Sequence, residues 1–173
     1  MTRRPIQATI RGTGGGWNDD DGGVRDAFAR WPAGVALLAV RDEDDELEVL
    51  TVSAVTPVSV DPPLLLVCVG VHAGILPMLR DAGRFTVNVL AEDDRRAAAI
   101  AAERMPPDAS RFADGDPVMA GAVASFVCAL DAEHEGGDHA ILVGRIEHVA
   151  LGPDAPPLVH AARAYRGLRP GPL

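Results

Sequence analysis

The sequence has no lysine, and all 16 of its basic residues are arginines. This absence excludes a Schiff base to pyridoxal phosphate or a carbonyl substrate, and also a P-loop whose lysine reaches nucleotide phosphates. The 25 acidic residues leave a formal net charge of -9 at pH 7. Charge of this sign repels nucleic-acid backbones and anionic membranes, so neither is an expected partner. Any anion site must use arginine, hydroxyls or backbone N–H groups.

Cysteine and long apolar runs are scarce as well. Cys68 and Cys128 lie in separate apolar stretches, which excludes a CxxC redox pair and a zinc ribbon. We interpret both as reduced core residues. No apolar run approaches the roughly 20 residues of a membrane-spanning helix, and the N-terminus has no signal-peptide pattern. Together these absences favour a cytoplasmic protein.

The composition present is that of one globular domain. Hydrophobic residues make up 47% of the chain and charged residues 24%, which is untypical of an extended disordered protein. Residues 1–22 mix arginines, a triple glycine and an acidic cluster without periodicity, so we predict a flexible lead-in there. Residues 23–173 are predicted to form the domain.

Hydrophobic periodicity predicts six or seven antiparallel strands and a few short helices. A helix is expected at Val24–Trp31, and weak helical character begins at Leu158. The alternation of hydroxyl and apolar residues in 50–60 breaks phase at Ala54–Val55, which suggests a bulge or bend. The remaining strands are expected at 34–40, 47–53, 64–69, 84–90, 122–134 and 139–151, and the remaining helices at 75–82 and 94–104. This pattern implies a mainly β fold with short helices, a small β-barrel.

Two polar clusters are candidates for chemistry. Thr51, Ser53, Thr56 and Ser59 place neutral donors and acceptors along one ridge, which suits the polar edge of a flavin ring but is also typical of a half-exposed strand. Histidines and acids crowd residues 133–139, but their spacing matches no common metal site, so we interpret them as solvated turn charge. No metal is expected.

Four blocks of sequence, in order, resemble the flavin reductase-like family, over about residues 24 to 168. The blocks are Phe28–Val35, Leu50–Leu64, Gly83–Leu90, and Gly137–His139 with Val143–Ile146. The resemblance implies a split β-barrel of the FMN-binding type and a homodimer. It also implies an NAD(P)H-dependent flavin reductase that passes hydride from NADH or NADPH to FMN or FAD, with diffusible supply of reduced flavin to a partner monooxygenase.

Site residues follow from the same resemblance. The family's flavin-contacting segment matches Thr51, Val52, Ser53, Thr56, Pro57, Val58 and Ser59. Pro57 departs from the family pattern, because proline lacks both a hydroxyl and an N–H donor. In the loop where relatives often carry stronger phosphate ligands, this chain offers His72 and the backbone at Gly74. Asn88 is expected either to contact the cofactor or to bond neighbouring backbone.

His139 matches a histidine near the nicotinamide side of the flavin, and the resemblance gives it a positioning role as the catalytic candidate. Its imidazole is expected to donate to the nicotinamide carboxamide or to the flavin edge. Two alternatives stay open at this point. One is a non-catalytic flavin- or ligand-binding split barrel, and the other is an oxidoreductase that retains its flavin and acts on its own organic substrate.

Overall fold

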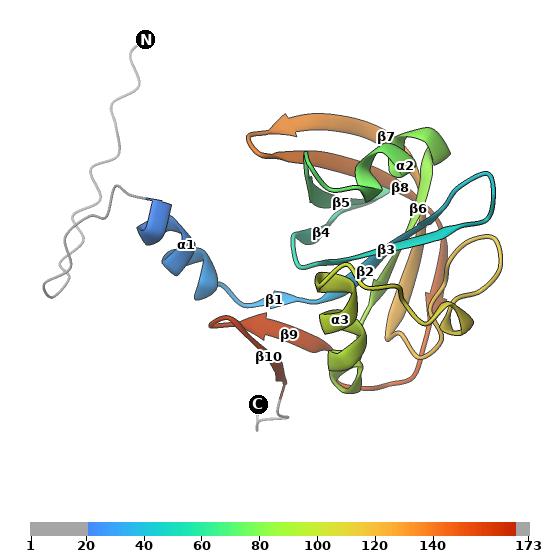
Figure 1. The fold of residues 1–173 in the computed structure, drawn as a ribbon. Helices are drawn as coiled ribbons and strands as arrows, with labels where there is room; N and C mark the ends of the chain where they lie inside the picture. Colours follow the sequence, from blue (N-terminus) through green and yellow to red (C-terminus); the bar gives the residue numbers. More distant parts are fainter. Residues whose placement is uncertain (1–20, 169–173) are drawn as a thin grey trace, which may run out of the picture.

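The computed structural model describes residues 21–168 (Figure 1). The lead-in expected for residues 1–22 therefore lies outside the described residues up to residue 20, and helix α1 (Asp21–Ala29) begins at the boundary. Among the described residues, no helix has both the length and the apolar character that crossing a membrane requires.

Seven strands form one antiparallel sheet, which confirms the mainly β prediction. They are arranged in the order β3-β2-β6-β7-β8-β5-β4. Their bounds are β2 (Ala36–Arg41), β3 (Leu47–Val52), β4 (Val55–Val60), β5 (Pro63–Gly70), β6 (Arg84–Val89), β7 (Ala124–Gly136) and β8 (His139–Leu151).

The two outermost strands of this sheet are consecutive in the sequence. Only Ser53 and Ala54 separate β3 from β4, and the N–H of Cys68 on β5 donates to the carbonyl of Ala54 at 2.9 Å. The sheet must therefore curl until its edges meet, so the predicted phase break is the point where the chain crosses from one edge to the other.

The β4 strand also contains a bulge, which lies beyond the phase break predicted at Ala54–Val55. Its register against β5 shifts between Pro57 and Ser59. Proline cannot donate to a ladder and is tolerated at a bulge or on an edge strand, and β4 supplies both conditions.

Buried side chains form two clusters, one on each face of the sheet. The barrel interior holds Leu38, Val67, Phe85 and Leu142 among others, and helix α2 (Ile75–Ala82) packs against it through Ile75. The second cluster lies where helix α3 (Arg95–Ala102) and the C-terminal strands cover the outer face. It includes Leu37, Leu90, Ala98, Phe112 and Leu158.

The helical character expected from Leu158 is wrong. β9 (Leu158–Ala161) lies between β1 (Ala33–Gly34) and β10 (Ala164–Gly167) in a small antiparallel sheet. Leu158 is fully buried, and its N–H donates to the carbonyl of Leu90 at 2.8 Å. Tertiary pairing thus decides the conformation of this short segment.

Short 3-10 turns at Glu92–Asp94 and Ala109–Arg111 flank α3.

Gly144→Ala tests how tightly the barrel interior is packed. A Cβ at Gly144 would come within 2.6 Å of Phe85 Cζ and 2.9 Å of Cys128 Cβ, and both neighbours are buried. We expect the free energy of unfolding to fall by about 1–3 kcal/mol in chemical denaturation, the usual cost of overpacking. The matched variant Gly34→Ala, whose Cβ would have no atom within 4 Å, should change stability little. Equal stability of the two variants would contradict this packing.

Candidate functional site

A cleft of about 460 Å³ lies at the seam where the two edges of the sheet meet. We call it the seam cleft. Its lining comes from the end of β3 and the bend after it, the end of β5 with the following turn, the β7–β8 turn and the residue two positions after α3. These residues are Leu50, Thr51, Val52, Ser53, Ala54, Cys68, Val69, Gly70, Val71, His72, Ala73, Arg104, Asp138 and His139. The volume is within the roughly 300–1,000 Å³ of small-molecule sites.

Five of the predicted site residues line the seam cleft: Thr51, Val52, Ser53, His72 and His139. Thr51 is half-buried, and its hydroxyl donates to the carbonyl of Ala98 on α3 at 2.7 Å. Because the Val52 side chain is buried in the barrel core, its backbone is the part available to a ligand. Ser53 is exposed at the bend.

The other predicted residues of the flavin-contacting segment lie beyond this cleft, on β4. Thr56, Pro57 and Val58 are exposed, and Ser59 is half-buried. The Thr56 hydroxyl reaches only the carbonyl of Pro57, at 3.4 Å. Gly74 directly follows the cleft residue Ala73 and caps the N-terminus of α2, and the space where its Cβ would be is open.

Asn88 lies in the interior, away from the seam cleft. Its side chain is 0% exposed. The amide nitrogen donates to the carbonyl of Pro117 at 3.1 Å, and the amide oxygen accepts from the N–H of Met119 at 2.8 Å and from the hydroxyl of Ser125 at 2.7 Å. These bonds occupy the amide, so the geometry favours the backbone-bonding role over cofactor contact.

His139 is half-exposed at the start of β8 and is held by its neighbour. Its Nδ1 lies 2.7 Å from Oδ1 of Asp138. This hydrogen bond, together with the charge interaction with the same ring, lowers the pKa of Asp138 from its ordinary value. An ionised carboxylate only accepts, so Nδ1 carries the proton and Nε2 of the neutral ring is an acceptor. The donation expected from the sequence therefore requires the protonated imidazole.

Nine of the lining residues were not predicted as site residues, and Cys68 and Arg104 are among them. Cys68 is a free, half-buried thiol whose pKa is raised by burial, so it is a poor nucleophile. Arg104 follows the end of α3 with a φ of 55°. The sequence gives no sign of its position in the cleft, because the direction of that side chain depends on a left-handed residue after the helix. Cys128 is buried, and burial raises its pKa to about 12.

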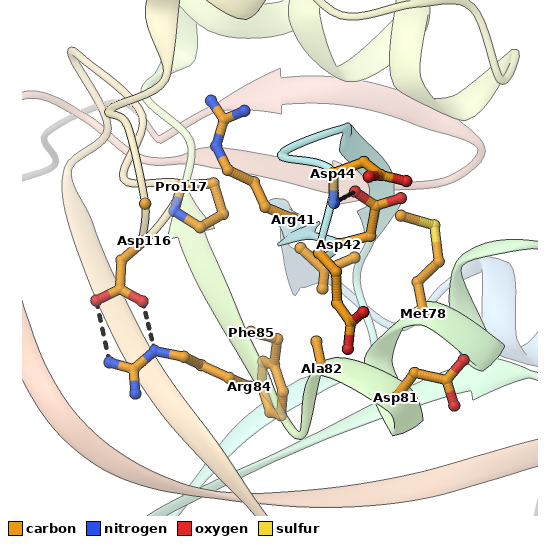
Figure 2. A pocket seen from close by; sticks show the side chains of 13 residues that line it. Arg41, Asp42, Asp44, Met78, Asp81, Ala82, Arg84, Phe85, Asp116 and Pro117 are labelled. Atoms are coloured by element: carbon orange, nitrogen blue, oxygen red, sulfur yellow. Dashed lines mark hydrogen bonds and ion pairs between the residues drawn. The ribbon is translucent and has the colours of Figure 1, made fainter.

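A larger cavity of about 800 Å³ lies beside the β2–β3 turn (Figure 2). Carboxylates surround it, among them Asp42, Asp44 and Asp81. Arg84 faces this cavity but is paired with Asp116 at 3.0 Å. The excess of negative charge repels phosphate groups, which makes this cavity unsuited to a nucleotide. Within residues 21–168, no group of three or more His, Cys, Asp or Glu side chains is placed to hold a metal ion.

Comparison with known proteins gives consistent findings. Residues 28–169 match the family model described as "Flavin reductase like domain". The chain is 38% identical, over 144 residues, to the reductase component of 4-hydroxyphenylacetate 3-monooxygenase from Thermus thermophilus, covering 83% of this chain and 94% of that protein.

Solved structures agree with this match. BorF, the flavin reductase component of a bacterial two-component tryptophan halogenase, superposes with a TM-score of 0.80 at 33% identity, covering 88% of this chain and 100% of that chain. The NADH:FAD oxidoreductase SgcE6 of Streptomyces globisporus, solved with NAD and FAD fragments, gives a TM-score of 0.80 at 30% identity, covering 87% and 94%. The expected split-barrel fold is thereby confirmed.

Proposed function

The chain belongs to the flavin reductase-like family, and on that premise we propose that it is an NAD(P)H:flavin oxidoreductase that supplies reduced FMN or FAD to a partner monooxygenase. The observation that carries the proposal is the seam cleft. There the chain brings together the hydroxyl-bearing end of β3, an imidazole from β8 and an arginine from beyond α3.

The residues of the cleft suit this chemistry. When both nucleotides are bound, hydride passes from the nicotinamide C4 to the flavin N5, and the nucleotides themselves supply the reactivity. The chain is left to bind and orient two planar rings. Ser53 offers an exposed hydroxyl, and the backbone of Val52 to Ala54 offers further polar groups to a ring edge. No lysine, metal or activated nucleophile is required.

His139 orients the nicotinamide in this proposal. Asp138 fixes the ring through Nδ1, which leaves Nε2 as the nitrogen available to the nicotinamide carboxamide. Nε2 of a neutral ring accepts from the carboxamide NH₂, and Nε2 of a protonated ring donates to the carboxamide oxygen.

The partner and the cellular location belong to the same proposal. The Thermus relative is named as the reductase component of a monooxygenase and BorF as that of a two-component halogenase, which supports transfer of reduced flavin to a separate oxygenase. Free thiols at Cys68 and Cys128 and a nicotinamide co-substrate support a cytoplasmic location.

An assay of NAD(P)H oxidation with riboflavin, FMN and FAD tests the function directly. We expect catalytic loss of the nicotinamide absorbance with at least one of these flavins, and no loss without flavin. Flavin binding without NAD(P)H consumption would replace the proposal with the non-catalytic binder. Flavin that survives desalting and is reduced in place without release would favour the oxidoreductase that acts on its own substrate.

His139→Ala should raise the KM for NAD(P)H, or lower turnover, by about tenfold, equal to roughly 1.4 kcal/mol, because the carboxamide loses an oriented hydrogen-bond partner. The matched control is His134→Ala, on the same β7–β8 hairpin but exposed and outside the seam cleft. The measurement is steady-state kinetics on both folded variants. Wild-type kinetics for His139→Ala would remove the nicotinamide contact from the proposal.

A homodimer is also part of the proposal, supported by apolar side chains that the described part of the chain leaves exposed. Phe28 on α1 is 73% exposed, Trp31 just after it 77%, and Val60 on the edge strand β4 92%. α1 stands away from the barrel in Figure 1, and its bonds to the body reach the β9–β10 turn, where Arg163 contacts Asp26 at 2.6 Å. A second copy would bury this apolar surface.

Light scattering at micromolar concentration should give twice the chain mass of 18.1 kDa. Phe28→Ala should shift the monomer–dimer equilibrium toward monomer by about tenfold or more, because a buried aromatic anchor costs at least 1–2 kcal/mol to truncate. Arg25→Ala on the same helix is the control and should leave the equilibrium near that of wild type. A wild-type monomer that still reduces flavin would contradict the dimer.

A further inference from the structure

Arg104 occupies a backbone position that favours glycine. Helix α3 ends with the N–H of Arg104 donating to the carbonyl of Ala101 at 3.2 Å and the N–H of Met105 donating to that of Ile100 at 3.1 Å. This is a Schellman-type end, and Arg104 is its left-handed residue, with a φ of 55°. Glycine adopts this conformation without steric cost, whereas a residue with a Cβ adopts it only at a steric cost. The fold therefore gives no reason for an arginine here.

The Arg104 guanidinium is also available to bind a ligand. Among residues 21–168 it has no hydrogen-bond or ion-pair partner, although several other arginines are paired, such as Arg80 with Glu133 and Arg111 with Asp94. Arg104 is exposed and lines the seam cleft together with His72 and Ala73. Strained residues cluster at functional sites, where the strain is compensated by what the side chain does.

The turn after β5 contributes little positive charge to the seam cleft. Residues 70–75 contain no arginine, and His72 is their only ionisable side chain. Asp138, which also lines the cleft, has a lowered pKa and repels an anion in its ionised form. A phosphate group in this cleft would thus be drawn toward Arg104, which forms charge-assisted hydrogen bonds to phosphate oxygens.

We propose that Arg104 binds the phosphate group of the flavin nucleotide and makes the chain select FMN or FAD over riboflavin, at the expense of stability at the end of α3. This proposal rests on the proposed function for the identity of the ligand. It assigns the cation that binds the phosphate to Arg104, two positions after α3, and not to the loop that follows β5.

The test measures flavin binding without nicotinamide, by quenching of flavin fluorescence. Arg104→Gln should raise the Kd for FMN roughly tenfold or more, the size of one lost charge-assisted interaction, while the Kd for riboflavin changes less than about twofold. Arg104→Lys should retain part of the preference for FMN. Arg96→Gln is the control, because Arg96 carries the same charge on α3 but lies outside the seam cleft, and FMN affinity should stay near wild type.

Arg104→Gly separates this role from a structural one, because its two effects have opposite signs. It should raise the midpoint of thermal unfolding, since glycine relieves the left-handed strain, and it should weaken FMN binding as Arg104→Gln does. FMN affinity that is unchanged in both variants, or a wild type that binds FMN no more tightly than riboflavin, would overturn the proposal.

The nicotinamide nucleotide is the other source of phosphate in this cleft. A change confined to the KM for NAD(P)H, with the Kd for FMN intact, would assign Arg104 to that nucleotide and overturn the flavin assignment. If the wild type does not oxidise NADH in the presence of flavin, the result counts against the proposed function. The binding measurements do not depend on turnover, so they test the role of Arg104 separately.

Discussion

The link of two residues between β3 and β4 is the constraint on which the rest of the structure depends. Three Cα–Cα steps join Val52 to Val55, so the link can span only about 11 Å. A flat sheet of seven strands would hold its outer strands roughly 29 Å apart at the usual spacing of strands. The link is far too short for a flat sheet. Closure of the barrel follows, and with it both the enclosed core and the seam at which the cleft forms.

Closure also explains why the site combines residues that are distant in sequence. The end of β3 meets the end of β5 only because the sheet has curled, as the bond from Cys68 to Ala54 records. β5 pairs with β8 from Leu64 to Gly70, which places His139 opposite Gly70 and beside the same seam. Helix α3 is tied to β3 through the hydroxyl of Thr51, so the residue after α3 reaches the cleft as well.

Local pattern was sufficient to predict most of the fold, whereas most of the candidate site residues came from the family resemblance. The long strands alternate or are continuously apolar, and the β-prone runs were found within a few residues of their true ends. Asn88 shows where pattern fails, because a polar residue on a strand gives no sign of whether it faces a ligand or other backbone. Its partners Pro117 and Met119 come from a loop whose path no periodicity specifies. The position of Arg104 in the cleft could not be predicted for a related reason, because the direction of its side chain depends on one left-handed backbone angle.

Charge pairing separates the two cavities into different chemical environments. The chain is acidic overall, and Arg84 forms ion pairs with Asp116 and Glu147. The larger cavity is therefore lined by an excess of carboxylates that have no arginine partner of their own within the described part of the chain. Exposed ion pairs of this kind add little stability, but an arginine in such a pair is less available to bind an anionic ligand. In the seam cleft, Asp138 is hydrogen-bonded to His139, and Arg104 has no carboxylate partner among residues 21–168. An anion that approaches this acidic protein is therefore repelled from the larger cavity, and within the seam cleft it is repelled by Asp138 and attracted to Arg104, so a phosphate group is directed to Arg104.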